Sequence, residues 1–256
     1  KALRDKMAAE LRFEVLTPTL KLDSSDGQTR KTLFQLPDGR QIEAVLMRYD
    51  HDTYQGRSRR TLCISTQVGC AMGCTFCATG QMGFKRHLSS GEIVAQVMYY
   101  ARLLQEQGEA VTNVVIMGMG EPFHNYENTM AAIDRLNDPE GYNFGARRFT
   151  ISTSGLVPAI RQFAAEKRQV NLAVSLHAAE NGLRETMMPV NKRYKIDELI
   201  AACQDYVNIT GRRITFEWAL IHGVNDTPEV AQKLVALLKG MLCHVNAIPL
   251  NPPPGY

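Results

Sequence analysis

Residues 61–77 read TLCISTQVGCAMGCTFC, an apolar strand-like segment that runs into three closely spaced cysteines, Cys70, Cys74 and Cys77. Three thiolates in one short loop can surround a metal centre, but a closed structural zinc site requires four protein ligands. No fourth ligand follows nearby, because the next histidine is His87 and the next cysteine is Cys203. The run therefore indicates a metal centre that keeps one position open.

The most economical such centre is a [4Fe–4S] cluster whose fourth iron is open to a substrate or cofactor. The alternative is a zinc knuckle or a chance grouping of buried cysteines. It is the weaker interpretation, since cysteines packed this densely in a cytosolic protein are usually ligands. Cys63 lies in the same segment, and its apolar neighbours Leu62 and Ile64 indicate a buried structural thiol.

Composition places the chain among ordinary globular proteins. Its 256 residues, 45% of them hydrophobic, suffice for one large domain, alone or with a small appendage. No apolar run reaches the roughly 18 residues that a membrane-spanning helix needs. The first residues, KALRDKMAAELRF, are typical of an amphipathic helix rather than a signal peptide. The dense cysteines argue against a secreted disulfide scaffold, so we expect a cytoplasmic protein.

The net charge of +3 alone does not predict nucleic-acid binding. Basic residues nevertheless gather in three places along the chain. These clusters are Arg57, Arg59 and Arg60; Lys85, Arg86 and His87; and Lys192, Arg193 and Lys195. Clusters beside the cysteine loop could steer a phosphate backbone toward it. The alternative is that these residues are ordinary solvated surface charges.

From residue 61 onward, strand-like runs alternate with helix-length amphipathic stretches. Strands are predicted over residues 61–68, 111–117, 149–153, 171–175, 213–220 and 243–248. Helices are predicted near residues 90–107, 126–137, 157–166, 196–209 and 227–240. This alternation predicts an α/β fold, with a parallel sheet closed or partly closed into a βα barrel.

The N-terminal residues 1–58 break this rhythm. After the short helix, strand-like residues 32–36 and 41–47 flank an Asp38-Gly39 pair, which is a hairpin signal. We therefore expect two parts: an accessory element of helix plus β-hairpin over residues 1–58, and the barrel over residues 59–256. Residues 50–58 would form the loop between them.

Polar and glycine-rich residues follow most of the predicted barrel strands. They are Gly118–Pro122 (GMGEP), Ser152–Gly155 (STSG), Ser175–His177 (SLH) and Pro249–Asn251 (PLN). Because the carboxyl ends of barrel strands meet at one rim, we expect these residues to form a single site. Each alone would more often be an ordinary turn, a cap or a buried histidine.

The cysteine run, with Phe76 before its last cysteine, resembles the radical S-adenosylmethionine (SAM) enzymes. In that family the open iron binds SAM, and an electron from the cluster cleaves SAM to a 5′-deoxyadenosyl radical. The longer stretches RRTLCISTQVGCAMGCTFCATGQMGFKRHL, VVIMGMGEPFHNYENT, RRFTISTSGLVPAI, NLAVSLHAAENGLRETMMPVNKRY and CHVNAIPLNPPPG resemble a narrower group. That group methylates carbon 2 of adenosine in 23S ribosomal RNA and tRNA. Pro122 favours it over a sister group that methylates carbon 8.

The resemblance implies a fold and a set of residue roles. The fold is a partial (β/α)6 TIM-like radical SAM barrel. Cys70, Cys74 and Cys77 would hold the cluster. SAM would be contacted by Gly120, Glu121, Ser152, Ser175, Leu176, His177 and Asn251. Glu43 would accept a proton, and Cys63 would resolve a protein–RNA adduct by forming a disulfide with a carrier cysteine.

The resemblance also implies a reaction course and partners. Two SAM molecules would serve one methylation through a methyl-cysteine intermediate. We expect the carrier cysteine beyond Tyr256, in a longer protein of which this chain is a piece, because neither Cys203 nor Cys243 lies in its motif. The expected partners are 23S ribosomal RNA, tRNA and an electron donor such as flavodoxin, for a monomeric enzyme. The alternatives are carbon-8 methylation and a non-catalytic iron–sulfur or zinc protein that binds RNA.

Overall fold

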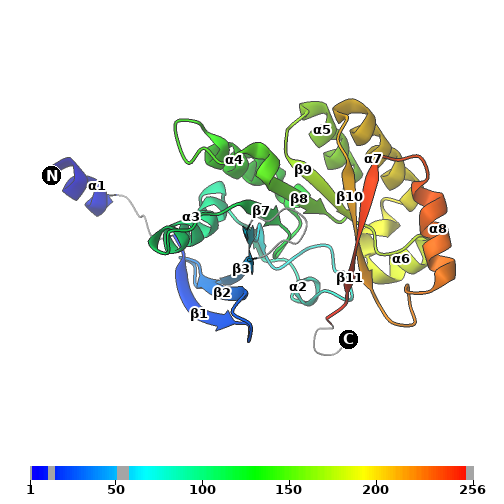
Figure 1. Ribbon diagram of the computed structural model, residues 1–256, viewed down its shortest axis with the longest axis horizontal. Helices are drawn as coiled ribbons and strands as arrows, with labels where there is room; N and C mark the ends of the chain where they lie inside the picture. Colours follow the sequence, from blue (N-terminus) through cyan, green and yellow to red (C-terminus); the bar gives the residue numbers. More distant parts are fainter. Residues whose placement is uncertain (1, 11–14, 51–57, 252–256) are drawn as a thin grey trace.

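The computed structural model describes residues 2–10, 15–50 and 58–251, and is built around one nine-stranded sheet (Figure 1). The strand order is β1-β2-β3-β4-β7-β8-β9-β10-β11. Pairing is parallel from β4 to β11 and antiparallel from β1 to β4. The parallel strands are β4 (Arg59–Cys63), β7 (Asn113–Ile116), β8 (Phe149–Thr153), β9 (Asn171–Ser175), β10 (Ile214–Leu220) and β11 (Cys243–Pro249).

Helices connect the parallel strands and cover the outside of the sheet (Figure 1). The long ones are α3 (Ser90–Glu106), α4 (Tyr126–Asn137), α5 (Val157–Glu166), α7 (Ile196–Thr210) and α8 (Pro228–Leu238). Helix α3 begins at a capping box in which Ser89 and Glu92 each satisfy the other's backbone amide. Helix α8 begins with Pro228 after a Thr227 cap. The predicted α/β partial barrel is confirmed, and α4, α5, β8 and β9 have the predicted bounds.

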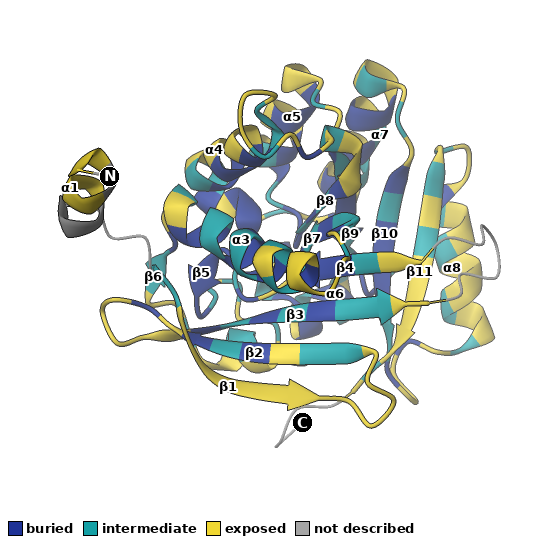
Figure 2. Cartoon of the chain, turned by 60° about the vertical axis from the view of Figure 1, so that its left-hand side comes forward, coloured by how far each residue is buried: buried dark blue, intermediate teal, exposed yellow. Residues whose placement is uncertain are grey.

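The antiparallel part comprises β1 (Thr17–Asp23), β2 (Thr29–Gln35) and β3 (Gln41–Tyr49). The predicted hairpin is confirmed, with Phe34 paired to Ile42 across the turn. Strand β1 was not predicted; it is exposed along its whole length, as Figure 2 shows, so no buried face marks it in the sequence. The N-terminal helix is confirmed as α1 (Ala2–Glu10), whereas residues 51–57 of the predicted loop lie outside the described residues.

Strand β3 pairs antiparallel with β4, so the hairpin and the barrel share one sheet. The division of the chain at residue 58 remains a prediction.

The segment predicted as one strand over residues 61–68 is divided, and this part of the prediction was wrong. Strand β4 ends at Cys63, and Gln67–Val68 form β5, which pairs with β6 (Arg86–His87) outside the main sheet. At the bend, Gln96 Oε1 accepts a hydrogen bond from the Ser65 amide at 2.8 Å, and Gln96 Nε2 donates one to the Ser65 carbonyl at 2.9 Å. A side-chain amide on α3 thus replaces the strand partner that this backbone would otherwise require.

No helix in residues 2–10, 15–50 or 58–251 combines the length and apolar character needed to cross a bilayer.

A buried tyrosine joins α3 to the antiparallel strands. The Tyr100 hydroxyl is hydrogen-bonded to Thr32 Oγ1 at 2.8 Å and to the Ala44 carbonyl at 3.0 Å. Both Tyr100 and Thr32 are fully buried. We expect Tyr100→Phe to lower the free energy of unfolding by about 1–3 kcal/mol, because it leaves buried polar groups without a partner. Urea denaturation measures this, and Tyr99→Phe, at the half-buried neighbour, should change it far less. Equal losses in the two variants would contradict the assignment.

Candidate functional site

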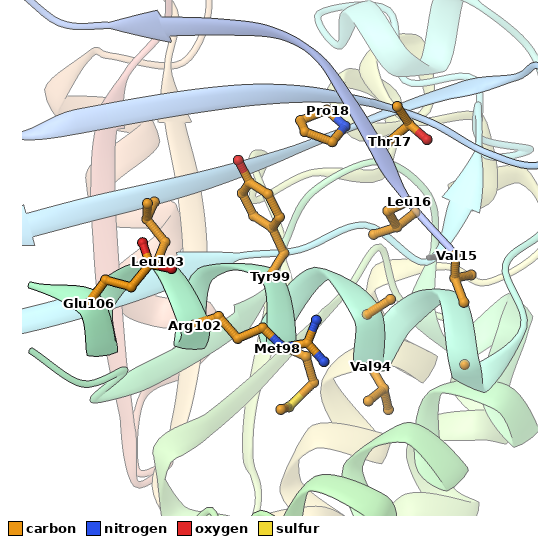
Figure 3. A pocket seen from close by; sticks show the side chains of 12 residues that line it. Val15, Leu16, Thr17, Pro18, Val94, Met98, Tyr99, Arg102, Leu103 and Glu106 are labelled. Atoms are coloured by element: carbon orange, nitrogen blue, oxygen red, sulfur yellow. The ribbon is translucent and has the colours of Figure 1, made fainter. Parts of the chain in front are cut away.

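A cavity of about 250 Å³ lies at the carboxyl ends of the parallel strands. It is lined by eight residues that the sequence singled out: Cys70, Cys74, Cys77, Gly120, Glu121, Ser152, Ser175 and His177. Other cavities are larger, including one of about 570 Å³ between β1 and α3 (Figure 3) and one of about 910 Å³ beside Arg212. Neither larger cavity is lined by a cysteine, so the small one is the candidate site.

The cysteine loop is held by backbone contacts at both ends. Gly69 has φ +72°, and a Cβ there would lie 1.8 Å from the Gly83 carbonyl oxygen, so only glycine fits. The Cys70 amide donates to the same carbonyl at 3.3 Å. Further along, the Thr75 amide donates to the Met187 carbonyl at 3.0 Å, which ties the loop to α6 (Asn181–Met187).

The thiols of this loop are partly withdrawn from water. Burial raises the pKa of Cys70 to about 11 and that of Cys74 to about 12. Without a cation, these side chains therefore stay protonated at neutral pH. A metal centre that binds them must supply the positive charge that stabilises the thiolates.

Glu121 lines the cavity and is only 2% exposed. Its carboxylate accepts from the Phe123 amide at 3.0 Å and from the Ser154 amide at 2.7 Å. Burial raises its pKa, and these donated bonds oppose that effect. Its own amide donates to Gln67 Oε1 at 2.8 Å, so β5 positions the residue.

His177 follows β9 with a left-handed backbone, φ +58°, which is uncommon for a residue other than glycine. Its Nδ1 accepts from the Ala219 amide at 2.9 Å, which leaves Nε2 as the N–H donor of the neutral ring. Burial lowers its pKa to about 3, so the imidazole stays neutral. Its ring meets that of Phe76 edge-on, with the centroids 4.9 Å apart.

Two predicted SAM contacts do not line this cavity. Leu176 is fully buried in the core, and its amide donates to the Glu217 carbonyl at 3.1 Å. Asn251 is exposed just after β11, whereas Ile248 of β11 lines the cavity. The roles of Leu176 and Asn251 therefore stay predictions without support from the cavity.

Glu43 and Cys63 lie on the neighbouring strands β3 and β4, outside the cavity lining. The Glu43 side chain is 43% exposed and forms an ion pair with Lys31 at 3.3 Å. Burial raises the pKa of Cys63 to about 11, and its thiol is hydrogen-bonded to the Met117 backbone. Met117 lines the cavity, so Cys63 lies just behind the wall.

Arg184 was not predicted as a site residue; it is fully buried on the short helix α6. Its guanidinium donates to the carbonyls of Ser154 at 2.6 Å, Ser175 at 3.1 Å and Leu176 at 3.1 Å. It also donates to Asn191 Oδ1 at 3.1 Å. One side chain thus holds the backbone where β8 and β9 end.

Asn225 plays a similar part after β10. Its amide nitrogen donates to the His177 carbonyl at 2.8 Å and to the Ala219 carbonyl at 2.7 Å, and its oxygen accepts from the Ile221 amide at 2.7 Å. It lies in the stretch HGVND, residues 222–226, which follows β10. Asn225 therefore fixes the unusual backbone of His177.

Comparisons with known proteins agree on the family. The sequence profile of the radical SAM superfamily matches residues 64–234. The curated "Dual-specificity RNA methyltransferase RlmN 1" of Myxococcus xanthus is 54% identical over 233 residues, which is 91% of this chain. "Probable dual-specificity RNA methyltransferase RlmN" of Bacillus mycoides is 50% identical over 251 residues, or 98% of this chain.

A solved structure agrees as well. The crystal structure of a radical SAM methyltransferase from Sphaerobacter thermophilus matches with a TM-score of 0.95 and 55% identity, covering 100% of this chain and 73% of that one. The chain spans 63% of the length of the Myxococcus relative and 67% of the Bacillus one.

Gly120 allows a test of the cavity wall. Its φ is +103°, and a Cβ there would lie 2.5 Å from Gln67 Cβ. We expect Gly120→Ala to displace Glu121 and to weaken binding of a ligand in the cavity at least tenfold, since the backbone must shift. Gly182→Ala on α6, where a Cβ meets nothing within 4 Å, is the matched control. Isothermal titration with SAM measures both, and unaltered affinity in Gly120→Ala would contradict the assignment.

Proposed function

This chain belongs to the radical SAM superfamily and, within it, to the RlmN family of dual-specificity RNA methyltransferases, and we propose that it serves the methylation of adenosine carbon 2 in 23S ribosomal RNA and tRNA. The observation that carries the proposal is the meeting of three cysteine thiols, the Glu121 carboxylate and the neutral His177 in one cavity. Thiols suit a soft metal centre, and the polar strand ends suit the charged groups of SAM.

The cysteines fit a [4Fe–4S] cluster better than a single ion. A closed structural zinc site requires four protein ligands, and this loop offers three thiols. A [4Fe–4S] cluster could be held by these three and keep one iron open. The donor set of Cys70, Cys74 and Cys77 therefore supports the cluster over a zinc knuckle.

Arg184 provides a second, independent sign of an anionic group. Its buried guanidinium is bonded to neutral oxygens only, and within the described residues no carboxylate pairs with it. An uncompensated buried charge costs several kcal/mol. The titratable side chains that raise the pKa of Arg184 are Cys74 and Cys203, through the negative charge of their thiolate forms. A cluster bound by three thiolates would supply the missing negative charge.

The chemistry demands such a site. Carbon 2 of adenine is electrophilic and carries no acidic proton, so it cannot attack the SAM methyl group as a nucleophile. When bound, the cluster and SAM supply the one-electron chemistry that this carbon requires. Cys70, Cys74 and Cys77 would hold the cluster at one side of the cavity. Glu121 would then accept the ammonium group of SAM, for which its carboxylate must be ionised.

The remaining cavity residues would orient SAM. Ser152 and Ser175 offer short hydroxyl groups from β8 and β9, and His177 offers its Nε2–H. The walls between them include Phe76, Met188 and Ile248, which exclude water from the reacting groups.

Glu43 and Cys63 would act on the RNA side of the reaction. We propose that Glu43 accepts a proton from the modified base, since its half-exposed carboxylate is reachable from outside. Cys63 would form the disulfide that releases the product. Its raised pKa means that the thiol must lose a proton before it attacks. An accessory role of residues 1–58, an electron donor of the flavodoxin type and a monomeric, cytoplasmic enzyme belong to the same proposal.

The proposal is tested by reductive SAM cleavage. The protein is reconstituted anaerobically with iron and sulfide, reduced and mixed with SAM, and 5′-deoxyadenosine is measured by mass spectrometry. Cys74→Ala should reduce product to background and remove the visible absorbance of the cluster. Cys203→Ala, at a buried thiol on α7 outside the cavity, should retain both. Product from Cys74→Ala at the wild-type level would overturn the ligand assignment.

The RNA target needs its own readout. RNA treated with the full-length protein is digested to nucleosides, and 2-methyladenosine would support the proposal. 8-Methyladenosine would instead show that the enzyme methylates carbon 8. Unmodified RNA from an enzyme that still cleaves SAM would contradict methylation at either carbon.

Arg184 can be tested through the reduction potential of the cluster. Arg184→Gln should make the cluster harder to reduce, because a nearby positive charge is lost. We expect about a tenfold lower ratio of reduced to oxidised cluster at a fixed potential, a shift of about 59 mV. Arg184→Lys keeps the charge and should stay close to wild type. Redox titration followed by EPR measures this potential. Equal potentials in the Gln and Lys variants would show that the charge of Arg184 does not act on the cluster and that its role is structural only.

A further inference from the structure

Three of the basic residues that the sequence singled out form ion pairs with carboxylates in the structure. Arg60 forms ion pairs with Asp50 and Glu109, Arg86 with Asp38 and Glu92, and Lys195 with Glu185. Paired guanidinium and ammonium groups contribute little to phosphate binding, because contact with RNA would require breaking the existing pairs.

Arg193 differs from these residues. It is exposed, its guanidinium carbon lies 5.3 Å from the centre of the Tyr194 ring, and no carboxylate within the described ranges pairs with it. Lys192 beside it is also exposed. A guanidinium stacked on an aromatic ring keeps its N–H groups directed outward and available to a phosphate.

Arg193 and Tyr194 line a second cavity, of about 300 Å³. Its other walls include Ala71 and Met72 of the cysteine loop, and His124, which follows β7. Met72 lines the central cavity as well, so the two cavities adjoin at one side chain. The second cavity thus lies at the same carboxyl edge of the sheet, next to the proposed site of chemistry.

The rings of Phe84 and His87 lie close to that of His124, which lines the second cavity. The His124 ring lies 5.4 Å from that of Phe84 and 4.9 Å from that of His87. Phe84 is 37% exposed and the adjacent Met82 56% exposed. Flat aromatic faces next to a free arginine are the arrangement on which unpaired RNA bases stack.

We propose that the cavity formed by Met72, His124, Arg193 and Tyr194 binds a nucleotide that neighbours the target adenosine in the RNA. Its base packs against Tyr194 and Met72, and its phosphate is bound by Arg193. This inference rests on the proposed RNA substrate. An acidic protein surface, such as that of an electron donor, would meet the same charge, but the hollow between Met72 and Tyr194 fits a planar base that enters it.

The test is binding of a fluorescein-labelled single-stranded oligoribonucleotide containing one adenosine, measured by anisotropy over a range of salt concentrations. Arg193→Ala should weaken binding and reduce the slope of log Kd against log salt by about 0.7, the value for one phosphate on a single strand. Tyr194→Leu should weaken binding about tenfold through lost stacking, with the slope unchanged. Arg193→Lys should retain the slope.

Arg135→Ala removes the same charge from the exposed last turn of α4 and is the control, with wild-type binding expected. Unfolding midpoints of all variants exclude loss of fold. If wild type binds the RNA and the Arg193 and Tyr194 variants bind it like the control, the nucleotide site is refuted while the proposed function stands. If Arg193→Ala impairs only reduction by an acidic electron donor, the surface serves that protein instead. If wild type does not bind RNA, both proposals fall.

Discussion

The buried guanidinium of Arg184 is the constraint on which the site depends. It bonds the backbone carbonyls of Ser154 and Ser175, where β8 and β9 leave the sheet. The Met187 carbonyl of the same helix, α6, accepts a hydrogen bond from the Thr75 amide of the cysteine loop. The strand ends and the cysteine loop are therefore positioned by one short helix, and among the described residues only neutral oxygens accept hydrogen bonds from its Arg184.

Burial explains both the chemistry of the site and its need for a cofactor. It keeps the His177 ring neutral and raises the pKa of the Cys70 and Cys74 thiols. It also raises the pKa of Glu121, against which the backbone donors of Phe123 and Ser154 act. We propose that positively charged SAM stabilises the ionised carboxylate of Glu121, and that the iron ions of the cluster stabilise the thiolates of Cys70 and Cys74.

The sequence predicted the parts of the fold that repeat and missed the parts held by single side chains. Strands β8 and β9 were found with correct bounds, because a short apolar run between helices has few other interpretations. The bend after Cys63 depends on Gln96, far along the chain, and could not be read locally. Arg184 lies on a short helix, where an arginine is normally solvent-exposed. Its structural role is recognisable only from its burial in the structure.

We propose that Cys70, Cys74 and Cys77 hold a cluster with one iron open to SAM. The most direct measurement is the EPR spectrum of the anaerobically reconstituted, reduced protein, recorded with and without SAM. We expect a [4Fe–4S]⁺ signal whose shape changes when SAM is added, because SAM would bind the open iron. A protein that takes up no cluster, or a cluster signal that SAM leaves unchanged, would contradict it.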